Sequence, residues 1–237
     1  MNLTTTFNIF FWLTLIFFNV KFFTGNVYTW LDYAYLVFIF IIMCFVNQSL
    51  MSSLCNGNIN GGVIAYATIP TWFIMFGLML VALKKMPGWK APFSNTFGYF
   101  LLVLSGYKTK LEKHIKPDIQ VKYNYVYQNP LIIINEFDLS TIDSAYSSET
   151  IRNVFDLDAE GVKDLLFKLV MFKELVSEFI WFILTGIIII SVSYNIISTN
   201  SCANTKTVDT AVADDAEATA SIPDNTQDST RVYSVTE

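Results

Sequence analysis

Four apolar stretches, each close to the length needed to cross a bilayer, constrain this chain more than any other feature. A transmembrane helix needs about 20 predominantly apolar residues. The stretches run over residues 7–23, 28–46, 62–83 and 179–198. Charged residues make up only 15% of the 237-residue chain and apolar residues 53%, whereas about a quarter of a soluble domain is charged. We therefore expect an α-helical multi-pass membrane protein with about four spans.

The first stretch, residues 7–23, has no basic segment before it and no small-residue cleavage site after it. It is therefore expected to be a retained span and not a signal peptide. A fifth apolar stretch, residues 96–104, is too short to cross. Extending it back to Ala91 would place Pro92 and Asn95 in hydrocarbon. We predict a short re-entrant or interfacial segment there, within a membrane domain of residues 1–105.

The lysines predict an orientation, because basic residues are retained on the cytoplasmic side of a membrane. Residues 84–116 carry seven lysines against Glu112, Lys21 lies between the first two spans, and residues 47–61 carry no charge. This pattern places Lys21 and residues 84–178 inside, and the N-terminus, residues 47–61 and the tail outside. If residues 96–104 crossed the membrane, the region from 106 onward and the tail would exchange sides.

Sequons and cysteines agree with this topology without testing it. The sequons at Asn2 and Asn47 fall on the predicted outer side. A disulfide between Cys55 and Cys202 would need both residues in one oxidising compartment. Cys44 is expected to be a small packed or lipid-facing apolar residue, since the three cysteines match no zinc or redox spacing.

Residues 106–178 form the region able to fold in water. Residues 119–128 alternate apolar and polar side chains, and residues 131–137 follow an Asn-Pro break, which predicts a β-hairpin. From Asp158, a plausible N-cap, apolar residues recur at helical spacing. No breaker separates this helix from the last span, so one continuous stalk is expected. The region is thus predicted to be a small α+β extramembrane domain.

The tail, residues 199–237, carries seven acidic residues against two basic ones, which accounts for the whole net charge of −5. It has few apolar residues and is expected to be disordered. Residues 1–198 are electrically balanced, so no basic nucleic-acid-binding face is predicted and nucleic acid is not an expected partner.

Residue types that carry catalysis are scarce. His114 is the only histidine and lies in a lysine-rich stretch without a positioned partner. No nucleophile elbow, phosphate loop or metal-binding motif is present in the sequence. We therefore predict no enzyme, no cofactor and no metal. A lipid-acting membrane enzyme using His114 and interfacial acids is the weakest alternative.

Asp32 and Pro70 support a different alternative, a channel or carrier. Asp32 is the only acidic residue within a predicted span, and intramembrane carboxylates are often functional. Its place near the span's start, beside Trp30 and Tyr33, favours an interfacial carboxylate instead. Pro70 would kink the third span and free a carbonyl.

The run from Lys84 to Leu102, KKMPGWKAPFSNTFGYFLL, separates the third span from the short segment. Lys84, Lys85 and Lys90 are predicted to contact anionic lipid headgroups, and Trp89 to anchor at the interface. Asn95 and Thr96 are predicted to cap the short apolar helix that follows.

Part of this run resembles a motif of multi-pass membrane proteins from nucleocytoplasmic large DNA viruses, including the algal viruses and their giant relatives. The resemblance covers residues 62–104. It rests on the string W-x-x-P-F-x-N-T-x-G-Y, formed here by Trp89, Pro92, Phe93, Asn95, Thr96, Gly98 and Tyr99.

The resemblance implies a minor capsid or inner-membrane protein of the virion. Such a structural protein would anchor or link the internal membrane, beneath the capsid, to the capsid shell. Its implied partners are the lipid bilayer and neighbouring capsid or minor capsid proteins, and homo-oligomerisation stays open.

Overall fold

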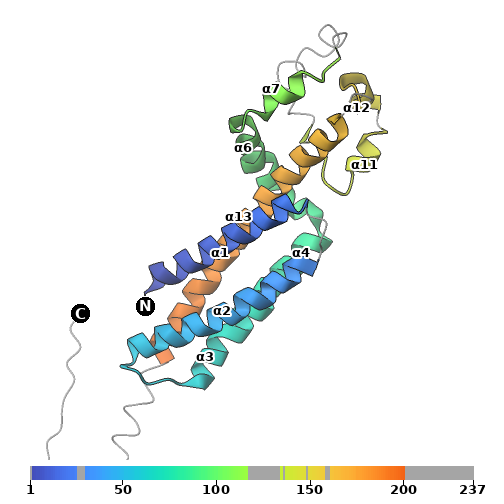
Figure 1. Cartoon of the computed structure of the whole chain (residues 1–237). Helices are drawn as coiled ribbons and strands as arrows, with labels where there is room; N and C mark the ends of the chain where they lie inside the picture. Colours follow the sequence, from blue (N-terminus) through green and yellow to red (C-terminus); the bar gives the residue numbers. More distant parts are fainter. Residues whose placement is uncertain are drawn as a thin grey trace, which may run out of the picture. The chain divides into compact units, whose positions relative to one another are not determined.

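Helices supply nearly all of the regular structure, as an apolar chain in a bilayer requires (Figure 1). The computed structural model describes residues 2–25, 30–116, 134–135, 137–147, 149–157 and 161–200. All of them lie in the first of the chain's two structural units, Met1–Ser201.

Among the described residues, four helices are long and apolar enough to cross a membrane, which agrees with the prediction of about four spans in a helical protein. They are α1 (Leu3–Phe23), α2 (Trp30–Leu54), the continuous helix Gly61–Lys85 and α13 (Val162–Asn200). The third combines α3 (Gly61–Thr68), the π-helical η1 (Ile69–Met75) and α4 (Phe76–Lys85). Each is longer than its predicted span.

The helix ends follow from local side-chain chemistry. Asn2 caps α1 by accepting a 2.8 Å hydrogen bond from the Thr5 amide. Asn60 caps α3 by accepting bonds from the amides of Gly62 and Val63. Asparagine is favoured at such positions because its oxygen binds amides that lack a helical partner. These caps fix where α1 and α3 begin.

The π-helical turn η1 begins next to Pro70, which cannot donate a backbone hydrogen bond. The Thr71 hydroxyl donates to the Ala67 carbonyl, and the Thr68 hydroxyl donates to the Ile64 carbonyl. These bonds satisfy the Ala67 and Ile64 carbonyls next to the irregular turn. The third span is therefore locally unwound at its proline while remaining one helix.

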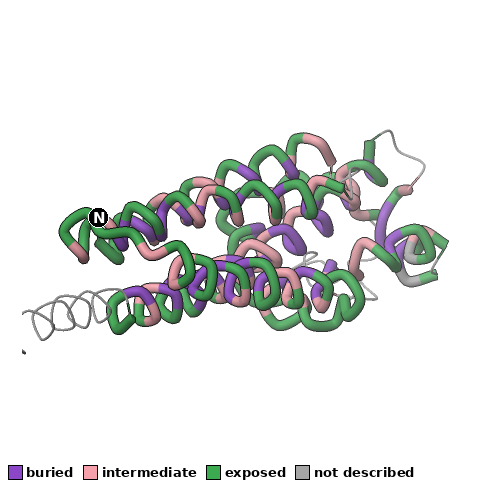
Figure 2. The backbone as a smooth tube through the Cα atoms, turned by 90° about the horizontal axis from the view of Figure 1, so that it is seen from below, coloured by how far each residue is buried: buried purple, intermediate pink, exposed green. Residues whose placement is uncertain are grey.

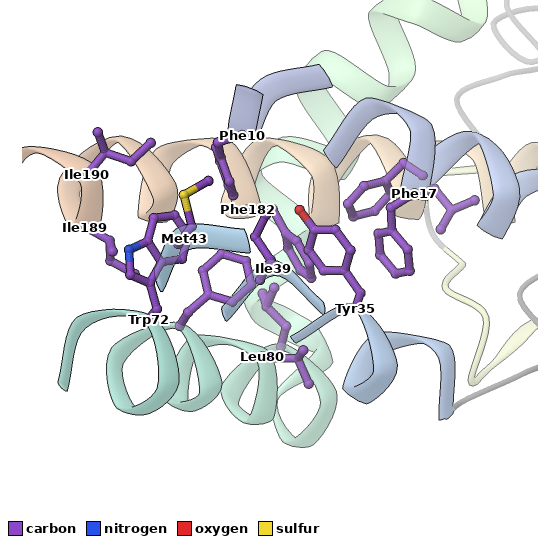
Figure 3. Packing of buried hydrophobic residues seen from close by; sticks show 14 of the residues in the cluster. Phe10, Phe17, Tyr35, Ile39, Met43, Trp72, Leu80, Phe182, Ile189 and Ile190 are labelled. Atoms are coloured by element: carbon purple, nitrogen blue, oxygen red, sulfur yellow. The ribbon is translucent and has the colours of Figure 1, made fainter. Parts of the chain in front are cut away.

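Aromatic side chains fill the middle of the bundle. Figure 3 shows Tyr35, Trp72 and Phe182, which come from three different spanning helices, pointing toward one another. Tyr35 satisfies its buried hydroxyl with a 2.7 Å hydrogen bond to Thr14 of α1. The bundle is thus packed by large rings; the Tyr35 hydroxyl has a partner, whereas the buried indole nitrogen of Trp72 has no hydrogen-bond partner among the described residues.

Gly186 allows α1 and α13 to approach each other. A Cβ atom at this position would lie 2.1 Å from the ring of Phe10, which is fully buried. Small residues commonly permit such close helix packing in membranes. Figure 2 shows buried positions alternating with exposed ones along the long helices, as expected when one face packs and the other meets lipid.

A polar cluster holds the bundle together at the end where α2 finishes. The Asn47 amide donates 2.9 Å hydrogen bonds to the Thr68 hydroxyl and the Ser193 hydroxyl. Asn47 is 2% exposed and lies within α2, which continues to Leu54. The prediction of a loop beginning at residue 47 is therefore wrong. The helix extends because Asn47 has polar partners inside the bundle.

The run after the third span is helical and follows α13. It comprises η2 (Pro87–Lys90), α5 (Ala91–Phe93), the π-helical η3 (Ser94–Gly98) and α6 (Tyr99–Leu104). Its tertiary contacts are chiefly with α13, and it is not one of the four long apolar helices. Its buried side chains pack toward α13, and the re-entrant or interfacial position of the segment stays a prediction.

The described part of residues 106–178 is a small helical assembly. It contains α7 (Tyr107–Glu112), α11 (Ile142–Ala145) and α12 (Glu149–Val154). Together with the first turns of α13 they bury a second apolar cluster. In the described ranges the only β-type pairing is an isolated bridge between Ile115 and Phe155.

The predicted hairpin falls mostly outside the described residues. Ile134, a described residue of the predicted second strand, lies in helical backbone and is buried in the second apolar cluster. This part of the strand prediction is wrong, because the apolar side chain packs among helices and not in a sheet. Asp158, Cys202 and the acidic tail also lie outside the described residues.

The predicted continuous stalk is confirmed as one helix, α13, of 39 residues. At a rise of 1.5 Å per residue it is about 58 Å long, nearly twice the hydrocarbon thickness of about 30 Å. One end packs in the second apolar cluster and the other packs between the spanning helices.

Candidate functional site

Charged side chains from all four spanning helices meet at one end of the bundle. Lys21 comes from the last turn of α1, Asp32 from the first turn of α2, and Lys84 from the last turn of α4. Glu174 and Glu178 project from α13 one turn apart. Lys90 of η2 completes the set. We call these six residues the ion-pair network.

Asp32 and Glu178 are the bridging acids of the network. Lys21 binds Asp32 at 2.9 Å and Glu178 at 2.5 Å, and Lys84 binds the second oxygen of Asp32 at 2.9 Å. The side chains of Lys21 and Asp32 are only 4% and 6% exposed. Asp32 is therefore buried between two lysines, which differs from the predicted interfacial carboxylate among aromatic residues.

Lys90 connects the run after the third span to the stalk. Its ammonium binds Glu174 and also lies 3.4 Å from Glu178. Burial alone would lower the pKa of Lys90, but the negative charges of Glu178 and Glu174 outweigh it and raise the pKa. The lysine is therefore firmly cationic in the fold.

The same network holds a loop between Asp138 and Thr141. Glu174 accepts a hydrogen bond from the Leu139 amide. Asp138 shapes this loop by accepting bonds from the amides of Ser140 and Thr141, both at 2.9 Å. Burial alone would raise the pKa of Asp138, but these bonds and those from the two hydroxyls lower it. The loop is thus fixed to α13 at the bundle's end.

The three lysines and three acids of the network balance. Removing charges from water carries a large penalty, which partners repay only when the geometry is good. Each acid here contacts at least one ammonium group. An arrangement of this kind specifies which helix ends meet. It is suited to holding helices in register.

A pocket of about 510 Å³ opens beside the network, between Tyr33, Pro87 and the loop at Ser140. Its walls carry both lysines and carboxylates, so no single sign of charge dominates it. Within the described ranges, no group of three or more histidine, cysteine or acidic side chains is arranged to hold a metal ion.

The motif residues Trp89 and Phe93 pack against one residue of α13. The ring of Trp89 stacks on Trp181 with centroids 6.1 Å apart, and Phe93 meets the same ring edge-on at 5.2 Å. The Trp181 indole donates a 2.9 Å hydrogen bond to the Trp89 carbonyl. Trp89 and Phe93 therefore both pack against Trp181 of α13.

Asn95 and Gly98 make a second contact with α13, at Lys173. The buried Lys173 ammonium donates a 3.2 Å hydrogen bond to the Asn95 side-chain oxygen. A Cβ atom at Gly98 would lie 2.7 Å from the Lys173 carbonyl oxygen. Glycine is thus required for η3 to approach the stalk this closely.

The remaining motif residues stabilise the run itself. Thr96 donates a hydrogen bond to the Pro92 carbonyl, and Tyr99 packs against the second apolar cluster. Asn95 and Thr96 do not cap a helix, because both lie inside η3 and α6 begins without a side-chain cap. The capping prediction is wrong because the helix begins at Ala91, before these residues.

The three lysines predicted to contact lipid headgroups have different surroundings. Lys84 binds Asp32 and lies 4.3 Å from the centroid of the Tyr33 ring. Lys90 is engaged by the two glutamates of the network. Lys85 is exposed at the end of α4, and its contact with headgroups stays a prediction.

Sequence reasoning singled out Asp32 and the lysines after the third span but missed Glu174, Glu178 and the role of Lys21. A signal was present: the two glutamates are four residues apart, immediately before the last apolar stretch. Asp32 and Pro70 are not brought together. Asp32 lies at the network, whereas η1 follows Thr68, which contacts Asn47 at the other end.

Comparison with protein families, curated proteins and solved structures found no match to this chain.

Proposed function

We propose that this chain is a structural membrane protein of a large DNA virus virion, which anchors or links the internal membrane to the capsid shell. The mechanical part of this proposal rests on α13. One uninterrupted helix of 39 residues packs at one end among the spanning helices and at the other in the extramembrane cluster. A rigid element shared by both regions suits a connector.

The ion-pair network supports the same function. It joins the ends of α1, α2 and α4 to α13, and Glu174 also holds the loop at Leu139. Force applied to the extramembrane helices would therefore pass into all four spans and not into one flexible joint. The viral setting is supported by the resemblance of the string from Trp89 to Tyr99.

Fractionation of purified virions tests the proposal. Gentle detergent should release the protein with the membrane fraction, and protease treatment of intact particles should leave it protected beneath the shell. Detection only in infected-cell membranes, with none in purified particles, would exclude the virion function.

A double substitution, Trp89→Ala with Asn95→Ala, tests whether the motif serves assembly. Because both residues contact α13, the variant must first be shown to accumulate in the membrane. Impaired particle assembly by a correctly inserted variant supports the proposal, and normal assembly counts against a function for the motif.

The alternative, a channel or carrier using Asp32 and Pro70, gains no specific support from the described residues. Asp32 is paired with two lysines, and large rings fill the centre of the bundle. Reconstituted protein that conducts ions, and stops conducting in Asp32→Asn, would favour the channel over the structural function.

A further inference from the structure

A small basic pocket lies in the extramembrane region, next to the beginning of α13. It has a volume of about 170 Å³ and is lined by Lys116, Tyr146, Arg152, Phe155, Leu157 and Lys163. Three of these six residues are cations, and none of the described lining residues is acidic. In Figure 1, α12 and the first turns of α13 lie close together in this region.

Hydrogen bonds that involve neither the Arg152 guanidinium nor the Lys163 ammonium hold the backbone around the pocket. The amide of Lys116 donates to the Val154 carbonyl at 3.0 Å, and its ammonium donates to the Arg152 carbonyl at 2.8 Å. The Tyr146 hydroxyl donates to the Lys163 carbonyl at 2.8 Å. The guanidinium of Arg152 and the ammonium of Lys163 have no acidic partner among the described residues.

Among the described residues, the acidic residues Asp143, Asp156 and Asp164 lie near the pocket without lining it. Asp164, in the first turn of α13, is bound by Lys168 at 2.7 Å. Burial, followed by the charges of Asp143 and Asp164, raises the pKa of Tyr146 to about 12, so its hydroxyl stays protonated at neutral pH. The first turn of α13 adds the positive end of a long helix dipole.

We propose that this pocket binds an acidic side chain presented by a peptide segment of a partner protein. Arg152 and Lys163 would contact the carboxylate, and Lys116 and Tyr146 would line its approach. The inference rests on the proposed connector function, for which it names the chemistry of the partner. The volume of 170 Å³ is below the roughly 300 Å³ of small-molecule sites, so it suits one side chain and not a whole cofactor.

The position of the pocket favours a protein over the chain's own membrane. Lys163 precedes Glu174 and Glu178 of the network by 11 and 15 residues on one helix, which corresponds to about 17–22 Å. The pocket therefore lies well beyond the ends of the other spans. The chain's own acidic tail follows Asn200, at the opposite end of α13.

Peptide binding by the full chain tests this inference. The protein is placed in phosphatidylcholine nanodiscs and titrated into fluorescein-labelled hexaglutamate, with labelled hexaglutamine as the neutral control, and anisotropy is recorded. The double variant Arg152→Gln with Lys163→Gln should bind hexaglutamate about tenfold more weakly, as expected for two partly exposed ion pairs.

Lys85→Gln with Lys110→Gln is the matched control, because it removes the same charge from two exposed lysines outside the pocket. The control should bind hexaglutamate like the wild type. Equal weakening in both variants, or no weakening in the pocket variant, would overturn the proposal. The replaced groups are exposed, so folding should persist. If the double variant unfolds, the hexaglutamate affinity of the single variant Arg152→Gln decides between these outcomes.

A second arm distinguishes a lipid ligand. Phosphatidylserine in the discs should weaken hexaglutamate binding equally for wild type and pocket variant. Weakening confined to the wild type would show that the pocket binds lipid headgroups, and would overturn the peptide assignment. Virion fractionation decides the proposed function separately: pocket-dependent binding by a protein absent from virions would leave this site standing without the connector function.

Discussion

Gly98 provides a direct test of how the run after the third span is held. A Cβ atom there would lie 2.7 Å from the Lys173 carbonyl oxygen and 2.9 Å from the Lys173 Cα, whereas ordinary contacts begin at 3.4 Å. In Gly98→Ala, η3 must therefore move from α13 by about 0.7 Å. The clash is with backbone, so no side-chain rotation relieves it.

Such overpacking typically destabilises a protein by about 1–3 kcal/mol. At about 2–4 °C per kcal/mol for a chain of this size, the melting temperature should fall by about 2–12 °C. Thermal unfolding in nanodiscs, followed by tryptophan fluorescence, measures the fall. Hydrogen exchange should also accelerate in residues 91–104, because their helical turns lose contact with the stalk.

Gly88→Ala is the matched control, because a Cβ atom at that position meets nothing within 4 Å. It should leave the melting temperature unchanged or slightly higher, since alanine restricts the unfolded chain more than glycine does. Equal melting temperatures for the two variants would refute the close approach of Gly98 to α13.

Three further predictions concern other contacts. Glu178→Gln should destabilise the bundle by about 3 kcal/mol, the lower end of the cost of breaking a buried ion pair, because Lys21 and Lys90 each keep a second acid. Thermal melts should show no comparable loss for Asp164→Asn, which breaks an exposed pair. Asn47 should remain unglycosylated in a glycosylating host, because its amide is buried; a glycosidase-sensitive mass shift in the Asn2→Gln variant would contradict this. The lowered pKa of Asp138 means that its stabilisation is present above its ordinary value of 3.8 and is lost as the pH falls through the folded pKa; melts across that range should show a steeper acid loss in wild type than in Asp138→Asn.

The spans were predictable because hydrophobic length alone reports them. The residues at which the helices end were less predictable. The helix α2 continues past Asn47 because Thr68 and Ser193, which are distant in sequence, supply its hydrogen-bond partners. A single polar residue after an apolar stretch looks the same whether it begins a loop or enters a polar cluster. Only the tertiary partners distinguish the two.

The candidate site was only partly predictable, because its arrangement also depends on residues that are distant in the sequence. The charge of Asp32 was visible in the sequence, but its burial depends on Lys21 and Lys84 arriving from two other helices. The basic pocket depends on Ile115 pairing with Phe155, which brings Lys116 to Arg152 across a long sequence separation. Neither arrangement has a local periodicity that a sequence could display.

The packing of the run from Trp89 to Tyr99 changes how its resemblance to viral membrane proteins is interpreted. Trp89, Asn95 and Gly98 each contact α13, and Gly98 does so at a distance that no other residue permits without movement. The string therefore makes an internal helix contact through part of its residues, while Trp89 is 50% exposed and Pro92 and Thr96 are exposed as well. A protein that shares the string for this reason should also carry an aromatic residue and a lysine eight residues apart on its last helix, as Trp181 and Lys173 are here. The basic pocket at Lys163, ten residues before Lys173 on the same helix, is a separate surface for the proposed partner.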